Sequence, residues 1–432
     1  MRKLLHHPAG RVLLGLALAA QAQAAFGQSA DLAELTLAQA ELLLQSRNRE
    51  LLAARRALEA AQANTLTAGA RPNPTLSLGV AAINPQAGVG SGPWRDKTVD
   101  SSIRVDQVIE RGDRRELRVA TAQSLAAASA ENLSDAYRQQ RIAFRSAYYE
   151  LLFSQDKTSI ARDNAVLFGV STRAAELRLK AGDIAAADVA RLRVDALRAA
   201  NDARAAEGEL RRAQLALAYL IGAEAQAAAI QAVDPWPAVA DAAEGGVTDE
   251  LIERRPDVRA AKIRLEAARS ARELARSLGT RDLTVGAQFD HYPVGAGANA
   301  FGTGNSYGVF VSMPFFARYR YEGEIQRAEV DYGAALEALD KARAQARAEF
   351  SRALSDLESA GERMRRHDES LLVEAKKAAD SAEFAYKNGA IGVMDLLDAR
   401  RTLRAIQIDA ASTRNDYAKA LSAWLISSGK VE

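Results

Sequence analysis

"KNGAIGVMDLLDARR", residues 387–401, has a near copy much earlier in this chain. The earlier stretch is "KAGDIAAADVARLR", residues 180–193, and the two share a lysine, a glycine, an isoleucine and an aspartate at a constant offset of 207 positions. Both patterns predict the end of a helix, a short turn held by glycine, and the start of a new helix. A turn that occurs twice at one offset indicates that the chain contains two copies of a larger unit.

The composition predicts long helices. The 432 residues are 48% hydrophobic but only 6% aromatic, so much of the apolar content is alanine, and 26% of the residues are charged. Alanine-rich, charged sequences are typical of closely packed helices rather than of a bulky globular core. The chain has no cysteine, which excludes disulfides, thiolate metal sites and a lipid-modified N-terminal cysteine.

Residues 1–28 are expected to be a secretory signal peptide. Arg2, Lys3 and Arg11 surround the apolar segment "VLLGLALAA", and "AQA" at 20–22 or 22–24 offers a cleavage site. The alternative is a membrane anchor, but the apolar run is much shorter than the ~20 residues that a spanning helix needs. Removing three positive charges changes the formal charge from +2 to −1, so the charge gives no argument for a nucleic-acid partner.

Proline positions leave room for very long helices. None of the ten prolines lies between Trp94 and Asp234 or after Pro314. A helix over about 115–180 would be roughly 100 Å long. Near 325–357, apolar residues recur at spacings of three and four and predict a narrow packing seam, as in coiled coils.

Four short segments alternate between apolar and polar residues and are predicted to be strands. They are "TLSLGVAAI" (75–83), "SSIRVDQVI" (101–109), "LTVGAQFDHY" (283–292) and "SYGVFVSM" (306–313). Glycine-rich connections join them in pairs as hairpins. The strands of the two pairs are again related by an offset of 207, whereas the helices expected at about 35–67 and 248–278 align better at 208.

The chain is therefore predicted to be an internal duplication of helix, two strands, long helix, turn and long helix. The repeats are placed at 29–235 and 236–432, with a connection at 222–247. Within them, we expect strand segments at 72–110 and 280–315 and long helices at 111–222 and 317–428.

Four strands with one apolar face point to a membrane but cannot close a barrel alone. Open strand edges are not tolerated in lipid, and barrels of this kind need at least eight strands. Several copies must pool their strands: two copies would give eight and three would give twelve. Aromatic residues near the strands are typical of an interfacial girdle, or alternatively fill a small β core. They are Trp94, Tyr292, Phe301, Tyr307, Phe315, Phe316, Tyr319 and Tyr321.

Three stretches make the whole mature chain resemble the TolC family of outer-membrane efflux proteins. They are "VFVSMPFFARYRYEGEIQRAEVDY" (309–332), "ERRPDVRAAKIRLEAARSA" (253–271) and "AYKNGAIGVMDLLDARRTL" (385–403). The first is most similar to the branch that serves heavy-metal efflux pumps of the resistance-nodulation-division (RND) type. Many relatives carry a lipidated N-terminal cysteine, which this sequence lacks.

The resemblance implies a mainly α-helical fold with a membrane β-barrel. Three copies would form a twelve-stranded barrel in outer-membrane lipid and a helical tunnel in the periplasm. The expected partners are the other two copies, a periplasmic adaptor protein and an inner-membrane RND pump. Gly182 and Gly389 would lie at the tips that meet the adaptor, and Asp395 and Asp398 would line the closed periplasmic aperture.

Asp395 and Asp398 are three residues apart and so project from one helix face. In a trimer they would form a ring of six carboxylates, which attracts cations. The alternative is that both only stabilise the N-terminal dipole of their helix. The first copy keeps one acid, Asp188, but has Arg191 at the second position. This suggests that an Asp398–Arg191 or Asp395–Arg193 bridge holds the aperture shut.

The sequence offers no basis for catalysis. His6 and His7 leave with the signal, and His291 and His367 have no cysteine to complete a metal or nucleophile cluster. "GTGNSYG" (302–308) precedes a strand rather than a helix and is not a phosphate loop. We expect a channel that conducts heavy-metal cations and contains no cofactor or resident metal. The alternatives are a multidrug or type I secretion conduit, and a periplasmic coiled-coil scaffold without a pore.

Overall fold

The computed structural model describes residues 32–81, 83, 86, 99–239, 247–292 and 304–429. The expected signal peptide, Trp94 and Phe301 lie outside the described residues. None of the helices described is both long and apolar enough to cross a membrane. In chain order the elements are η1 (Leu32–Glu34), α2 (Leu37–Arg47), α3 (Arg49–Gly69), β1 (Thr75–Ala81), β2 (Asp100–Ile109), α4 (Arg114–Ala181), α5 (Ala186–Ile221), η3 (Glu224–Ala229), α6 (Asp249–Arg254), α7 (Pro256–Ser277), β3 (Leu283–Tyr292), β4 (Gly304–Ser312), α8 (Glu322–Arg366), η4 (His367–Leu371), α9 (Leu372–Lys387) and α10 (Val393–Ser428).

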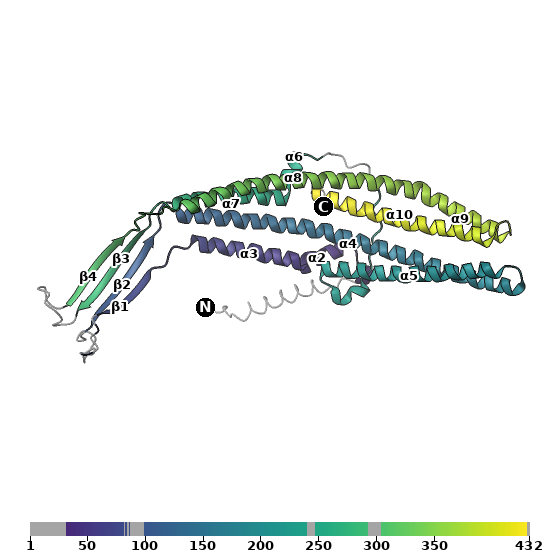
Figure 1. Cartoon of the computed structure of the whole chain (residues 1–432), viewed down its shortest axis with the longest axis horizontal. Coiled ribbons are helices and arrows are strands. Elements are labelled where there is room, and N and C mark those ends of the chain that lie inside the picture. Colours follow the sequence, from purple (N-terminus) through teal and green to yellow (C-terminus); the bar gives the residue numbers. More distant parts are fainter. Residues whose placement is uncertain are drawn as a thin grey trace, which may run out of the picture. The chain divides into compact units, whose positions relative to one another are not determined.

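The element order confirms a mainly helical, duplicated fold. Helices α5 and α10 begin and end 207 positions apart, and each ends at a left-handed glycine, Gly222 or Gly429. Glycine is favoured directly after the last turn because it adopts the left-handed conformation that ends a helix without steric cost. Each of these helices runs back from a turn along the helix before it, so that α4 with α5 and α9 with α10 form two helical hairpins (Figure 1).

The helix before each strand pair differs from the expectation. It is broken once in each copy: between α2 and α3 at Asn48, and between α6 and α7 at Arg255. Both residues have extended backbone and lie 207 positions apart, so the expected offset of 208 is corrected to 207 here as well. Asn48 accepts the amide hydrogen of Leu51 (3.1 Å) and so caps the start of α3. Periodicity continues across such a break and does not reveal it.

The second copy contains a π-helical segment that the first lacks. Helix α4 is continuous over 68 residues, whereas η4 separates α8 from α9. The seam predicted at 325–357 is confirmed, because Leu339, Ala346, Phe350 and Leu357 on α8 are all buried.

The helices and strands divide into two compact units. Of the described residues, those within Met1–Leu52, Ala136–Val247 and Glu349–Glu432 form one unit, and those within Ala53–Asp135 and Thr248–Ala348 form the other. The first unit has a core in which Tyr148 is fully buried. Burial raises the pKa of Tyr148 well above its usual range, so its hydroxyl stays protonated and donates to the Leu35 carbonyl (2.9 Å).

The second unit contains an antiparallel sheet in the order β1-β2-β3-β4 (Figure 1). The register places Leu78 beside Ile103, Ile103 beside Phe289, and Phe289 beside Tyr307. Cross-strand neighbours share a face, so one face is a continuous apolar surface. It comprises Leu76, Leu78, Val80, Ile103, Val105, Ile109, Leu283, Val285, Ala287, Phe289, Tyr307, Val309 and Val311, with Gln107 as a polar interruption and Ser101, His291 and Asn305 at its far end.

This apolar face is open to solvent in the single chain. Leu78 is 72% exposed, Val309 80% and Tyr307 81%. The opposite face carries mostly polar and small residues, including Arg104, whose Nε donates to Asp106 (2.8 Å) and whose guanidinium lies 4.7 Å from the Phe310 ring centroid. The predicted one-sided strands are confirmed.

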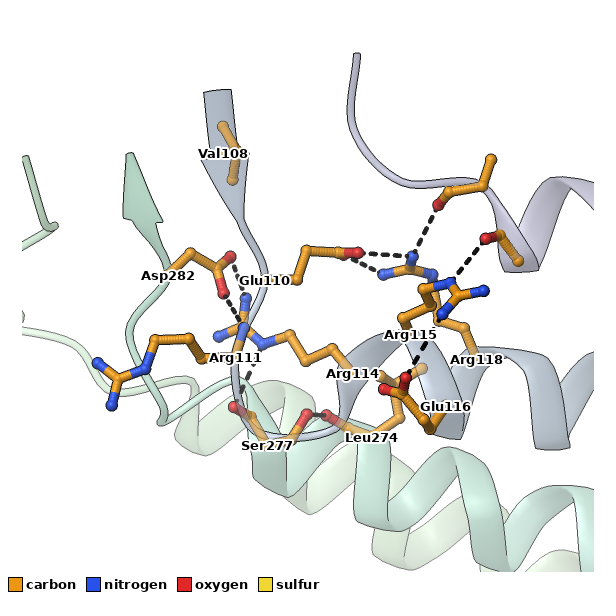
Figure 2. A network of polar contacts seen from close by, with 12 residues as sticks. Val108, Glu110, Arg111, Arg114, Arg115, Glu116, Arg118, Leu274, Ser277 and Asp282 are labelled. Atoms are coloured by element: carbon orange, nitrogen blue, oxygen red, sulfur yellow. Dashed lines mark hydrogen bonds and ion pairs between the residues drawn. The ribbon is translucent and has the colours of Figure 1, made fainter. Parts of the chain in front are cut away.

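A polar network fixes the joint between β2 and α4 (Figure 2). The chain turns through Gly112 and Asp113, whose φ angles are +72° and +54°. Arg114 is 13% exposed; its guanidinium bonds Asp282 (2.6 Å) and the carbonyl of Leu278 at the end of α7 (3.0 Å). Cations near a helix C-terminus satisfy carbonyls that have no partner within the helix. Arg114 therefore ties the sheet of this unit to α7.

Candidate functional site

The two hairpin tips contain the residues that the sequence analysis selected. Gly182 and Gly389 both lie in the left-handed region, with φ of +82° and +75°. Their amides donate to the carbonyls of Leu179 and Tyr386, both at 3.0 Å. The two turns therefore have the same geometry, and glycine is required at each for conformational reasons.

Each hairpin is held internally by an equivalent ion pair. In the first, Arg193 on α5 bonds Glu176 on α4 (2.7 Å); in the second, Arg400 on α10 bonds Glu383 on α9 (3.1 Å). The arginines, and likewise the glutamates, are 207 positions apart. Hydrogen bonds from Lys387 and Arg400 lower the pKa of Glu383 below its usual range, so it is ionised at neutral pH. The duplication has thus preserved the pair that closes each hairpin.

A second set of polar contacts joins the two hairpins to each other. Arg401 on α10 bonds Asp398 on its own helix (2.8 Å) and Asp195 on α5. The Asp195 side chain is only 11% exposed. Water therefore solvates its carboxylate poorly, and the positive charge of Arg401 compensates for the lost hydration. Further along the same helices, Arg404 bonds Asp202 (3.0 Å).

An aromatic contact adds to this set at the turns. Arg178 donates to the hydroxyl of Tyr386 (3.0 Å), and its guanidinium lies 5.5 Å from the centre of that ring. A guanidinium over a tyrosine face adds a cation–π attraction to the hydrogen bond. This contact links the last turn of α4 to the last turn of α9.

Apolar packing joins the tips as well. Leu397 on α10 is 1% exposed and belongs to a cluster with Phe168 on α4 and Val189 and Leu192 on α5. A leucine of the second hairpin thus completes the core of the first. Burying a leucine side chain stabilises this contact by roughly 1.5–3 kcal/mol.

Most residues that join the hairpins have no equivalent of the same kind in the other copy. Where the second copy has Tyr386, Asp398, Arg401 and Arg404, the first has Leu179, Arg191, Val194 and Leu197. Asp195, which receives Arg401, has Thr402 as its counterpart. Asp195, Tyr386, Arg401 and Arg404 were not predicted from the sequence. Comparing the copies position by position for charged residues present in only one would have found most of them.

The predicted acids lie at the start of α10. Asp395 is exposed and its carboxylate accepts the amide hydrogen of Gly392 (3.2 Å), which caps the helix. Asp398 is also exposed and bonds Arg401. Asp188, at the equivalent position of α5, is half-buried.

Neither suggested bridge forms within the chain. Arg193 bonds Glu176 and Asp398 bonds Arg401, while Arg191 is exposed and has no bonding partner among the described residues. Arg193 lies on the side of α5 that faces its own hairpin partner, α4. The suggested Asp395–Arg193 and Asp398–Arg191 bridges therefore stay a prediction for the assembled aperture; within one chain, Arg401 joins Asp398 to Asp195 of the first hairpin. The described residues contain no group of three or more histidine, cysteine or carboxylate side chains that could hold a metal ion.

Two relatives with assigned roles align with large parts of this chain. The pyoverdine export outer membrane protein OpmQ of Pseudomonas putida is 32% identical over 45% of this chain, but this match spans only 41% of the relative's length. The cobalt-zinc-cadmium resistance protein CzcC of Cupriavidus metallidurans is 25% identical over 85% of this chain and 84% of its own length.

A solved structure shares the fold. The outer-membrane channel OprN superposes with a TM-score of 0.75 over 91% of this chain and 89% of its own, at 22% identity. At that identity the similarity supports the fold alone.

The family described as "Outer membrane efflux protein" matches the chain twice, at residues 42–223 and 247–424. The double match agrees with the duplication. It confirms the expected location in the outer membrane, and it places the chain among transport proteins rather than enzymes. Because the two matches cover most of the chain, this protein belongs to the outer membrane efflux protein family, the TolC family that its sequence resembles.

Proposed function

We propose that this chain is the outer-membrane exit duct of a tripartite efflux system and conducts its cargo passively. The observation that carries the proposal is the one-sided sheet, whose apolar face is exposed in the single chain. A soluble protein would cover such a face, because large exposed apolar surfaces mark contacts with protein or lipid. Outer-membrane lipid is the partner that fits a flat face built from strands of about ten residues.

The sheet edges support a homotrimer. Among the described residues β1 pairs only with β2 and β4 only with β3, so one edge of each outer strand is unpaired. If β1 of each copy pairs with β4 of the next, every edge is satisfied, as a membrane requires. Three copies give twelve strands, with the face of Arg104 and Asp106 turned inward toward water.

The hairpin tips are the proposed contact with a periplasmic adaptor, which links the duct to an inner-membrane RND pump. Gly182 and Gly389 would lie at this contact. Both glycines are exposed, and a Cβ added to either would meet no atom within 4 Å. This leaves the tips free to meet a partner closely.

Asp395 and Asp398 are the proposed lining of the periplasmic aperture. Both are exposed at the start of α10, and three copies would bring six carboxylates to one axis. The capping bond of Asp395 uses one carboxylate oxygen and is compatible with this role. Arg401 would hold the second hairpin, and with it these acids, in the closed position.

We propose heavy-metal cations as the cargo. The CzcC relative aligns over most of both chains, and a ring of acids favours cations over neutral molecules and anions. The second candidate is an organic chelator or drug, because the pyoverdine exporter shows the higher identity, although over a shorter segment.

A deletion strain that carries either the wild-type gene or an empty vector tests both the proposed duct and its proposed cargo. We expect heat-modifiable trimers in the outer-membrane fraction, and loss of growth on Zn, Cd or Co salts without the gene. Sensitivity to dyes and detergents with unchanged metal tolerance would favour the second cargo. Trimers confined to the soluble periplasmic fraction would contradict the duct itself.

A further inference from the structure

Exposed arginines gather at the end of the sheet from which the helices continue. Arg71 precedes β1, Arg111 follows β2, and Arg318 and Arg320 follow β4. All four side chains are exposed, and among the described residues none of the four guanidiniums has a hydrogen-bond or ion-pair partner. The Glu322 carboxylate, which accepts the Arg320 backbone amide (2.9 Å), interacts with the Arg320 charge without forming an ion pair. Four exposed guanidiniums without an ion pair at one end of a sheet are an unexplained concentration of charge.

The neighbouring arginines have structural duties that these four lack. Arg114 bonds Asp282, and Arg118 bonds Glu110, so these two carboxylates are already neutralised (Figure 2). In the same view no dashed line reaches the guanidinium of Arg111; only its backbone amide donates, to Asp282 (3.1 Å). The free arginines are therefore not needed for the joint between sheet and helices.

The free cations lie where the apolar face of the sheet ends. Ile109 and Leu283 form the last apolar pair on that face, and Arg111 is two residues beyond Ile109. In a membrane protein the end of an apolar surface marks the level of the lipid headgroups. The side chains directly beyond it are then placed to meet phosphates.

Aromatic side chains fill the same level. Phe315 is 80% exposed, and the Arg281 guanidinium lies 5.5 Å from its ring centroid and 5.6 Å from that of Phe316. Phe316 in turn packs edge-on against Tyr321 at 5.4 Å. This cluster holds the segment on which Arg318 and Arg320 are exposed.

A cleft beside β2 offers one defined place for a headgroup. It has a volume of about 470 Å³ and is lined by Arg71 and Arg115 as well as by Gln107 and Glu110. The opposite end of the strands differs in charge, because Asp100 and Asp290 lie there on the polar face.

We propose that this basic rim, defined as Arg71, Arg111, Arg318 and Arg320, binds the phosphates of anionic phospholipids in the periplasmic leaflet of the outer membrane. The inference rests on the proposed function, which places the sheet in lipid. Arginine binds phosphate through two parallel hydrogen bonds and loses less hydration than lysine. Each cation near an anionic surface adds an attraction that salt weakens.

The test compares the thermal unfolding of detergent-solubilised trimers with added dioleoyl-phosphatidylglycerol or dioleoyl-phosphatidylcholine. We expect phosphatidylglycerol to raise Tm by several degrees more than phosphatidylcholine. The triple variant Arg111→Gln/Arg318→Gln/Arg320→Gln should lose at least half of this difference. The control Arg56→Gln/Arg352→Gln removes two arginines whose side chains are 80% and 84% exposed on helices away from the sheet and should keep this difference.

Three outcomes would overturn the proposal. They are equal Tm shifts with both lipids, an undiminished shift in the triple variant, and an equal shift with inorganic phosphate alone, which would indicate a free-anion site. The conductance of the triple variant in phosphatidylcholine bilayers distinguishes a failure of the lipid-binding proposal from a failure of the proposed duct. We expect it to equal that of the wild type, whereas absence of conductance in both would count against the duct and leave the lipid result to stand by itself.

Discussion

The two hairpin tips have the same backbone conformation, but their side chains make different contacts. Arg193–Glu176 and Arg400–Glu383 close the hairpins in the same way, and Gly182 and Gly389 turn the chain with the same bonds. Charged side chains of both tips meet at their contact, but Tyr386, Arg401 and Arg404 of the second tip have aliphatic counterparts in the first. The copies have therefore kept the interactions that fold a hairpin, and they differ in the residues that join the hairpins.

The largest expected effect is that of Leu397→Ala, because this residue joins the tips by packing. Truncating a leucine that is 1% exposed should cost roughly 2–5 kcal/mol. Hydrogen exchange should show faster opening in both α5 and α10. Leu197→Ala on α5, where the leucine is 67% exposed, is the control and should change little. Exchange confined to α10 would show that the tips are not coupled through this residue.

Arg401→Gln should come next. It leaves the Asp195 carboxylate, with a side chain only 11% exposed, without its counter-charge, at a cost of roughly 1–3 kcal/mol. Asp195→Asn should restore part of the loss, which a double-mutant cycle on hairpin opening would measure. Arg193→Gln breaks only a bond within the first hairpin and should leave the contact between tips intact. A coupling near zero would remove Arg401 from its assigned role.

Gly182→Ala and Gly389→Ala should have equal effects. An alanine in the left-handed region costs roughly 1–2 kcal/mol, and neither added Cβ would meet an atom within 4 Å. Local exchange at the two turns in the isolated trimer measures both costs. A clear difference between the turns would mean that one of them makes a contact absent from the other, and would break their equivalence.

The smallest effect is expected for Glu383. Its pKa is lowered by hydrogen bonds from Lys387 and Arg400, so its stabilising contribution is complete above the unfolded value of ~4.3 and is lost as the pH falls through the lower folded value. The side chain is 38% exposed, so screening by water keeps the contribution below about 1 kcal/mol. Glu383→Gln should abolish this acid sensitivity in exchange measured between pH 3 and pH 5, while Glu374→Gln on the same helix should preserve it. Equal acid sensitivity in Glu383→Gln would assign it to another group.

Secondary structure was predictable from the sequence wherever the spacing of apolar residues followed one helical or strand period without interruption. Strand β3 occupies the predicted 283–292, and α4 runs over 114–181 where 115–180 was expected, because strict alternation and a proline-free tract leave few other structures open. The breaks at Asn48 and Arg255 were missed, since a cap changes the direction of a helix without changing its apolar pattern.

The candidate site was predictable only in part. The sequence indicated Asp398 and Asp395, and it suggested Arg191 and Arg193 as their respective partners. A charged residue on an exposed helix face has several possible neighbours, and the rotation of one hairpin against the other decides which is met. Arg401 lies three residues after Asp398 and reaches Asp195, a contact across about two hundred residues of chain that local spacing cannot indicate.

We propose a passive duct in which the second hairpin tip of each copy lines the passage with acids. The most direct measurement is the reversal potential of purified trimers in planar phosphatidylcholine bilayers under a KCl gradient, for wild type and Asp395→Asn/Asp398→Asn. We expect discrete channels that prefer cations in the wild type and lose most of that preference in the double variant. A wild type without conductance, or the same cation preference in both proteins, would contradict this proposal.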